Sequence, residues 1–230
     1  MLVLGVDACR AGWVAVRLEA ATPGDPAVPT FAGAALAPTL TALPDWSSAT
    51  TTAVDIPLGL LDTGWRAADT RAAAAVGPRR GSVFRVPPRQ VWDEPEYAAA
   101  NLCCRRLTGA GLARQTFGLR AKLLEANALR DAGQQLYEVH PELSFRTMAG
   151  APLRYAKTSW SGVAMRRALL AGQGIVLPDE PGPAGRAAPD DVLDAAAVAW
   201  SAYRIATGRA GCLPEVPQVD RHGRPVAIWY

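Results

Sequence analysis

Apolar runs near the amino terminus predict a β-hairpin followed by a third strand. Residues 2–6 and 13–18 are apolar runs, and the residues between them, 8–12, end in a glycine. Two such runs around a glycine-containing turn are typical of a hairpin. A polar, proline-rich connection at 22–29 leads to another run at 30–36, which we predict to be the third strand.

The next part of the chain predicts a crossover helix and then a fourth strand. We expect the helix over 38–46 and the strand over 50–56, where β-branched residues gather. From 61 to 130 the pattern is mostly helical, except for a loop at 76–88 that is rich in glycine, proline and arginine. A short apolar run at 136–139 predicts a fifth strand.

The last long helix has the clearest boundaries. Pro189 supplies a start signal, residues 191–207 are rich in alanine, and Gly208 supplies a stop. The apolar run at 226–230 follows a glycine-containing turn and is predicted to dock as an edge strand.

This order of elements predicts an α/β fold. We expect a mixed five-stranded sheet, with three antiparallel strands and then parallel strands, flanked by helices and carrying a mainly helical insertion at about 61–133. That is the arrangement of ribonuclease H-like folds. Because the sequence contains no internal repeat or domain linker, we predict one domain over 1–230.

Four aspartates are candidate catalytic and metal-binding residues. Asp7 and Asp55 end the first and fourth predicted strands, and the carboxyl ends of parallel neighbours lie at one edge of a sheet. Asp191 and Asp194 are three residues apart on one face of the last helix. Four converging carboxylates are the ligands that a hard divalent cation prefers, so the pattern predicts a Mg²⁺ or Mn²⁺ site for phosphoryl transfer.

Each aspartate also has a structural alternative. Asp7 could cap the turn after its strand, and Asp55 could begin the segment that follows it. Asp190 and Asp191 could satisfy free amides at the start of a helix. Asp194 lies beyond the first turn, where capping accounts for it less well.

Two further candidates lie at the fifth predicted strand. The period of two places Glu138 and His140 on one side of that strand, where they could supply a metal ligand or a proton carrier. Alternatively, His140 is a core or turn histidine and Glu142 begins the next helix. With His222 as the only other histidine, a histidine-rich zinc site is excluded. The sequence also lacks the G-x-S-x-G elbow of serine hydrolases.

An arginine-rich loop is a candidate substrate-binding surface. It contains Arg79, Arg80, Ser82 and Arg85, which could form a basic wall against a phosphate backbone. The alternative is a solvated loop that Phe84 holds to the core. No P-loop and no G-x-G-x-x-G motif is present, which argues against nucleoside triphosphate chemistry by those routes.

Composition says more about the cellular location that we expect for the protein than about its function. The net charge of +3 neither requires nor excludes an anionic partner. No apolar stretch approaches a membrane span, and the amino terminus lacks a targeting pattern. The four cysteines have no CxxC spacing, which predicts reduced thiols in a cytoplasmic protein. The sequence leaves open whether the chain forms a homodimer.

Five segments together resemble an uncharacterised bacterial and archaeal family, the domain of unknown function numbered 429, often described as predicted nucleases with a ribonuclease H-like fold. The segments are residues 5–13, 54–60, 82–84, 138–142 and 190–195. Lys157, the turn at Gly162 and the pair Arg166 and Arg167 also look like that family's pattern. We expect Lys157 to contact substrate, together with Arg10 and His140. The stretch ahead of Gln115 departs from the pattern.

A more distant likeness concerns Holliday-junction resolvases of the same fold. Asp7, Asp55, Asp191 and Asp194 match their layout of acids. The resemblances imply a metal-dependent nuclease, acting on DNA or RNA, in which Asp7 bridges two metals roughly 4 Å apart. Two alternatives stay open: a non-catalytic nucleic-acid-binding or protein-interaction module, and a phosphatase or nucleotide-handling hydrolase on small substrates.

Overall fold

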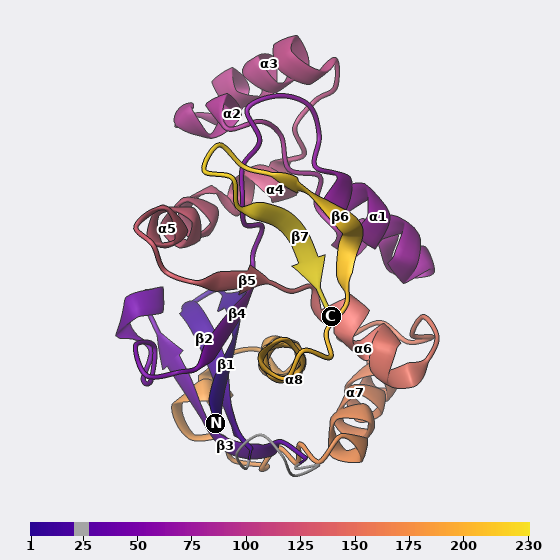
Figure 1. Ribbon diagram of the computed structural model, residues 1–230. Coiled ribbons are helices and arrows are strands. Elements are labelled where there is room, and N and C mark those ends of the chain that lie inside the picture. The colour runs from indigo at the N-terminus through magenta and orange to yellow at the C-terminus, as the bar shows by residue number, and fades with distance from the viewer. Residues whose placement is uncertain (21–27) are drawn as a thin grey trace. The chain divides into compact units, whose positions relative to one another are not determined.

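The computed structural model describes residues 1–20 and 28–230 (Figure 1). Most of the connection predicted at 22–29 therefore lies outside the described residues. The chain divides into two compact units. The first unit comprises Met1–Ile56, Gln135–Gly211 and Trp229–Tyr230, and the second comprises Pro57–Gln134 and Cys212–Ile228.

A mixed five-stranded sheet forms the centre of the first unit. Its strand order is β3-β2-β1-β4-β5; β1, β2 and β3 are antiparallel neighbours, whereas β4 is parallel to both β1 and β5. The predicted sheet, with three antiparallel strands and then parallel ones, is confirmed. The strands are β1 (Leu2–Cys9), β2 (Gly12–Glu19), β3 (Thr30–Ala37), β4 (Thr51–Asp55) and β5 (Leu136–Glu138).

Helix α8 (Pro189–Ala206) is the buried helix of the first unit. It contacts β1, β2 and β4 on one side and α6 (Pro141–Ala149) and α7 (Trp160–Gly172) on the other (Figure 1). Every residue from 192 to 203 is buried, and five of these twelve residues are alanines, so the helix can approach the strands closely. A Cβ atom at Gly5 would lie 1.9 Å from the backbone nitrogen of Ala199, which shows how closely β1 and α8 pack.

The crossover helix predicted over 38–46 is wrong. The structure has only a 3₁₀ turn, η1 (Leu40–Ala42), followed by further turns. Pro44 lacks the N–H group that a helix interior needs, and Asp45 has a φ of +62°, which is incompatible with a right-handed helix. The connection between β3 and β4 is therefore a loop.

The second unit combines helices with a two-stranded sheet. The predicted helical insertion between β4 and β5 is present, and α1 packs against β6 (Cys212–Val219), which pairs with β7 (Pro225–Trp229). Among the described residues, no helix is long and apolar enough to cross a membrane. The helices are α1 (Ala67–Val76), η2 (Gly77–Ser82), α2 (Gln90–Asp93), α3 (Tyr97–Thr108), α4 (Arg114–Gly118) and α5 (Arg120–Asp131).

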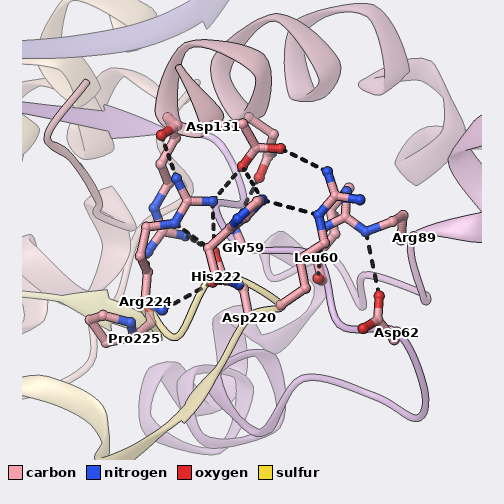
Figure 2. Close-up of polar contacts among 12 residues, drawn as sticks. Gly59, Leu60, Asp62, Arg89, Asp131, Asp220, His222, Arg224 and Pro225 are labelled. Atoms are coloured by element: carbon pink, nitrogen blue, oxygen red, sulfur yellow. Dashed lines mark hydrogen bonds and ion pairs between the residues drawn. The ribbon is translucent and has the colours of Figure 1, made fainter. Parts of the chain in front are cut away.

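A network of ion pairs joins the end of α5 to the turn between β6 and β7 (Figure 2). Arg224 Nε donates to Asp220 Oδ2 at 3.0 Å and its guanidinium also pairs with Asp131. Arg130 lies 3.6 Å from Asp220 and donates to the carbonyl of Pro225 at 2.7 Å. Burial alone would raise the pKa of Asp220, but hydrogen bonds from Arg224 hold that pKa below its ordinary value. We call these residues, with Arg221 and His222, the Asp220 network.

Candidate functional site

Asp7 and Asp55 lie side by side at the ends of two parallel strands. They are direct partners in the register between β1 and β4. Side chains alternate along a strand, so Asp7 points to the same face as Gly5, which is the face that α8 covers. Asp7 is 5% exposed and Asp55 is half-buried. The first two predicted site residues therefore share one edge and one face of the sheet.

Helix α8 brings the other two predicted aspartates to the same place. Asp194 is 3% exposed, and Asp191 lies nearly one turn earlier. The pKa of Asp7 is raised by burial and by the charges of Asp55, Asp194 and Asp191, so all four carboxylates act on one another. We call Asp7, Asp55, Asp191 and Asp194 the carboxylate cluster.

Lys157 supplies a positive charge next to the carboxylate cluster. It lies in the segment between α6 and α7, and its Nζ is 2.7 Å from Asp194 Oδ2 and 3.2 Å from Asp190 Oδ2. Asp190 and Asp194 are four residues apart and so lie on one face of α8, where both can reach the same ammonium. Burial would lower the pKa of Lys157, but the carboxylates raise it well above its ordinary value. The lysine is therefore positively charged at neutral pH.

One ammonium does not offset the charge of so many acids. Burial raises the pKa of Asp194 to about 7, although Lys157 opposes the change. Burial also raises the pKa of Asp55, with His140 and Lys157 opposing it, and it raises that of Asp191, with Asp190 adding to the effect. Every carboxyl of the cluster is thus held above its ordinary pKa.

The carboxylates of this cluster are suitable ligands for a divalent cation, but their arrangement is not that of a complete metal site. Carboxylate oxygens are the ligands that Mg²⁺ and Mn²⁺ prefer. Within residues 1–20 and 28–230, however, no three histidine, cysteine, aspartate or glutamate side chains are placed so that they could hold a metal ion. Lys157 contacts Asp194 instead, so a metal at Asp194 would compete with this ammonium.

The two residues predicted at the fifth strand lie at its carboxyl end. β5 ends at Glu138, and His140 is the N-cap residue of α6. Glu138 is the register partner of Val54, and Val54 points to the face opposite Asp55. Glu138 therefore lies on the other face from the cluster. His140 lies close enough to Asp55 to lower its pKa.

A buried ion pair beside the site has no signal in the sequence. Arg166 of α7 is fully buried and pairs with Glu142 in the first turn of α6. Glu142 also acts on Asp55, whose pKa it raises. The sequence suggests a helix-starting role for Glu142, but nothing in it links that residue to an arginine 24 positions later. The role of Asp190 as a second partner of Lys157 was also missed, although its spacing of four from Asp194 could have indicated it.

The predicted substrate-binding arginines lie in different parts of the chain. Arg10 is exposed in the turn between β1 and β2, within the first unit. Arg79, Arg80 and Ser82 belong to η2 of the second unit, and the guanidinium of Arg85 stacks 4.1 Å from the centre of the Trp65 ring. These residues of the second unit form a basic segment of their own.

Fold and site together define an α/β protein with carboxylates grouped at the carboxyl ends of two neighbouring parallel strands. The family described as "Protein of unknown function (DUF429)" matches residues 5–219. The chain therefore belongs to that family. The comparisons with curated proteins and with solved structures found no match.

Proposed function

We propose that the chain is a Mg²⁺- or Mn²⁺-dependent phosphodiesterase that hydrolyses nucleic acid, with a ribonuclease H-like arrangement of its sheet and acids. The observation that carries the proposal is the position of Asp7. It is the register partner of Asp55, and it is buried within the influence of Asp191 and Asp194. Buried carboxylates with raised pKa values are costly to keep, and such groups concentrate at functional sites.

The four carboxylates and Lys157 have different roles in this proposal. Asp7, Asp55, Asp191 and Asp194 would hold the cation, because they supply only hard oxygen donors. A bound Mg²⁺ or Mn²⁺ supplies positive charge for the phosphoryl oxygens and lowers the pKa of a coordinated water. Lys157 orients Asp194 by the contact at 2.7 Å and keeps part of the negative charge offset. Nucleic acid, as DNA or RNA, is the substrate class because it presents phosphodiester bonds to this charge arrangement.

The Asp7→Asn variant tests the proposal. The amide keeps the size of the side chain but removes its charge, so we expect metal-dependent cleavage of labelled DNA or RNA to fall by at least about 10³-fold. The circular dichroism spectrum should stay unchanged. Asp179→Asn is the matched control, because the Asp179 side chain is 97% exposed and distant in role from the cluster. Equal turnover in Asp7→Asn and the wild type would reject the assignment.

A second candidate is a nucleic-acid-binding or protein-interaction module that does not turn over. The observation that favours it is the contact of Lys157 with Asp194 and Asp190, which gives the acids a positively charged partner from the chain itself. In that case the wild type and Asp7→Asn would bind nucleic acid equally well, and Mn²⁺ would bind to neither.

A further inference from the structure

The segment that leads into α7, together with the first residue of that helix, carries two exposed aromatic side chains. Of the aromatic side chains that the structure describes, Trp160 and Tyr155 are the two in the exposed class, and Trp160 is 90% exposed. Tryptophan is seldom left in water to this extent, because burying its ring is strongly favourable. Both exposed rings occur within six residues of one another in the segment that also carries Lys157. We call residues 150–160 the platform segment.

The platform segment is held firmly to the helices behind it. Arg166 Nη1 donates to the carbonyls of Tyr155 and Gly162, each at 3.3 Å. Ser159 caps α7 by accepting a hydrogen bond from the backbone N–H of Gly162 at 3.1 Å. A Cβ atom at Gly162 would lie 1.8 Å from the carbonyl oxygen of Ala156, so the close approach of this turn to the helix requires glycine. The exposed indole therefore projects from an ordered support.

The same segment reaches the carboxylate cluster. Lys157, whose Nζ is 2.7 Å from Asp194, precedes Trp160 by three residues, and a chain of that length spans at most about 11 Å. The segment contains Arg154 and Lys157 and no acidic residue. Arg154 also stacks over the ring of Tyr155 at 5.4 Å. The exposed rings and two basic residues thus share one short segment with the lysine that contacts the cluster.

We propose that Trp160 stacks on an unpaired base of a single-stranded nucleic acid whose backbone runs past the carboxylate cluster. This inference rests on the proposed function and narrows its substrate from nucleic acid to single-stranded regions. Aromatic side chains next to positive charge are the usual means of binding single strands, because an unstacked base offers its face to the ring. The bases of an intact duplex are already stacked and cannot use the indole in this way.

The test compares variants of Trp160 for binding and for turnover. Binding of a labelled 12-nucleotide oligothymidylate is measured by fluorescence anisotropy in the Asp7→Asn background with Mg²⁺, so that the substrate stays intact. Trp160→Ala should weaken binding by about 5- to 150-fold, the range of a single base-aromatic stack. Trp160→Phe should keep most of the affinity because it retains a ring. A blunt duplex of the same length should bind all three proteins alike.

Val176→Ala is the matched control, since Val176 is an apolar side chain of the same unit that is 68% exposed. It should leave oligothymidylate binding unchanged. The proposal is overturned if Trp160→Ala binds as tightly as its parent, or if Trp160→Phe loses as much affinity as Trp160→Ala. It is also overturned if Trp160→Ala alters only the sedimentation behaviour of the protein, because the indole would then be a protein contact.

Failure of this inference can be told apart from failure of the proposed function. If Trp160→Ala loses binding but the wild-type chain shows no metal-dependent cleavage, the stacking role is supported and the phosphodiesterase is rejected. If the wild-type chain cleaves nucleic acid and Trp160→Ala cleaves single-stranded and duplex substrates as fast as the wild type does, only the stacking role is rejected.

Discussion

Acidic side chains gather at two places in this chain, and their surroundings shift their pKa values in opposite directions. In the Asp220 network, arginines surround two aspartates, and the pKa of Asp220 is lowered (Figure 2). In the carboxylate cluster, four aspartates and the neighbouring Asp190 share Lys157, and the pKa of every cluster member is raised. Asp220, Asp7 and Asp194 are all buried, so the difference arises from the charges around them, which are mainly positive at Asp220 and mainly negative in the cluster.

This difference separates a stabilising arrangement from one that costs stability. A buried carboxylate with several donors keeps its charge at little cost, and it fixes the elements that supply the donors. A buried carboxylate among like charges lowers stability, and such groups persist where a bound ligand or a reaction needs them. The contrast fits a stabilising role for the Asp220 network and supports the proposal that the carboxylate cluster is the functional site.

The largest expected effect is on the pH dependence of stability. Asp194 has a pKa of about 7 in the folded chain, whereas an unfolded aspartate loses its proton near pH 4. Between these values the folded chain binds more protons than the unfolded chain, so this contribution falls as pH rises and is lost above about pH 7. Its full size is at most about 4 kcal/mol.

The measurement is the free energy of unfolding of the wild type and Asp194→Asn from pH 4 to pH 8. The wild type minus variant difference should decrease steadily up to about pH 7 and then level off. A difference that does not vary with pH would contradict a raised pKa at Asp194.

A smaller effect is expected in the Asp220 network, where removing a carboxylate should lower the free energy of unfolding. Asp220→Ala leaves the guanidinium groups of Arg130 and Arg224 without their buried partner, so we expect a loss of about 3 kcal/mol in unfolding free energy. Urea denaturation measures it. Asp179→Ala removes an exposed partner of Arg167 and should cost less than about 1 kcal/mol. Equal losses in both variants would show that the network has no special role in stability.

The smallest expected effect concerns Lys157, which contacts the carboxylate cluster. Lys157 is 40% exposed, so Lys157→Met should cost about 1–2 kcal/mol at pH 8, less than for a fully buried pair. Mn²⁺ should then stabilise the variant more than it stabilises the wild type, because the metal no longer competes with an ammonium. Thermal unfolding with and without Mn²⁺ gives both quantities. Arg167→Met, at 44% exposure, is the control, and a response to Mn²⁺ equal to that of Lys157→Met would refute the competition.

The strands of the first unit could be predicted because their patterns agree with their positions. β1 begins with an apolar run that ends at Asp7, β4 contains three β-branched residues, and α8 has both a start and a stop signal. The helix expected over 38–46 does not form, because Pro44 cannot donate a helical hydrogen bond and Asp45 has a positive φ. β6 was missed because Pro214 and Pro217 interrupt its pattern, and prolines are tolerated in a strand only at edges.

The candidate site was only partly accessible from the sequence. The closeness of Asp7 and Asp55 could be inferred, because each lies near the carboxyl end of its strand and the two strands are parallel neighbours. The face on which Glu138 lies could not be predicted, because it depends on the register of β5 with β4, which the sequence does not contain. The partners Lys157 and Arg166 come from packing between α6, α7 and α8, and long side chains from distant segments leave no periodic signal.

Calorimetric titration of Mn²⁺ into the wild type and Asp7→Asn at pH 8 tests the central claim most directly. We predict saturable binding to the wild type and no binding to Asp7→Asn, because Asp7 is the carboxylate whose pKa all three other carboxylates raise. No heat from the wild type at millimolar Mn²⁺, or the same isotherm from both proteins, would contradict it.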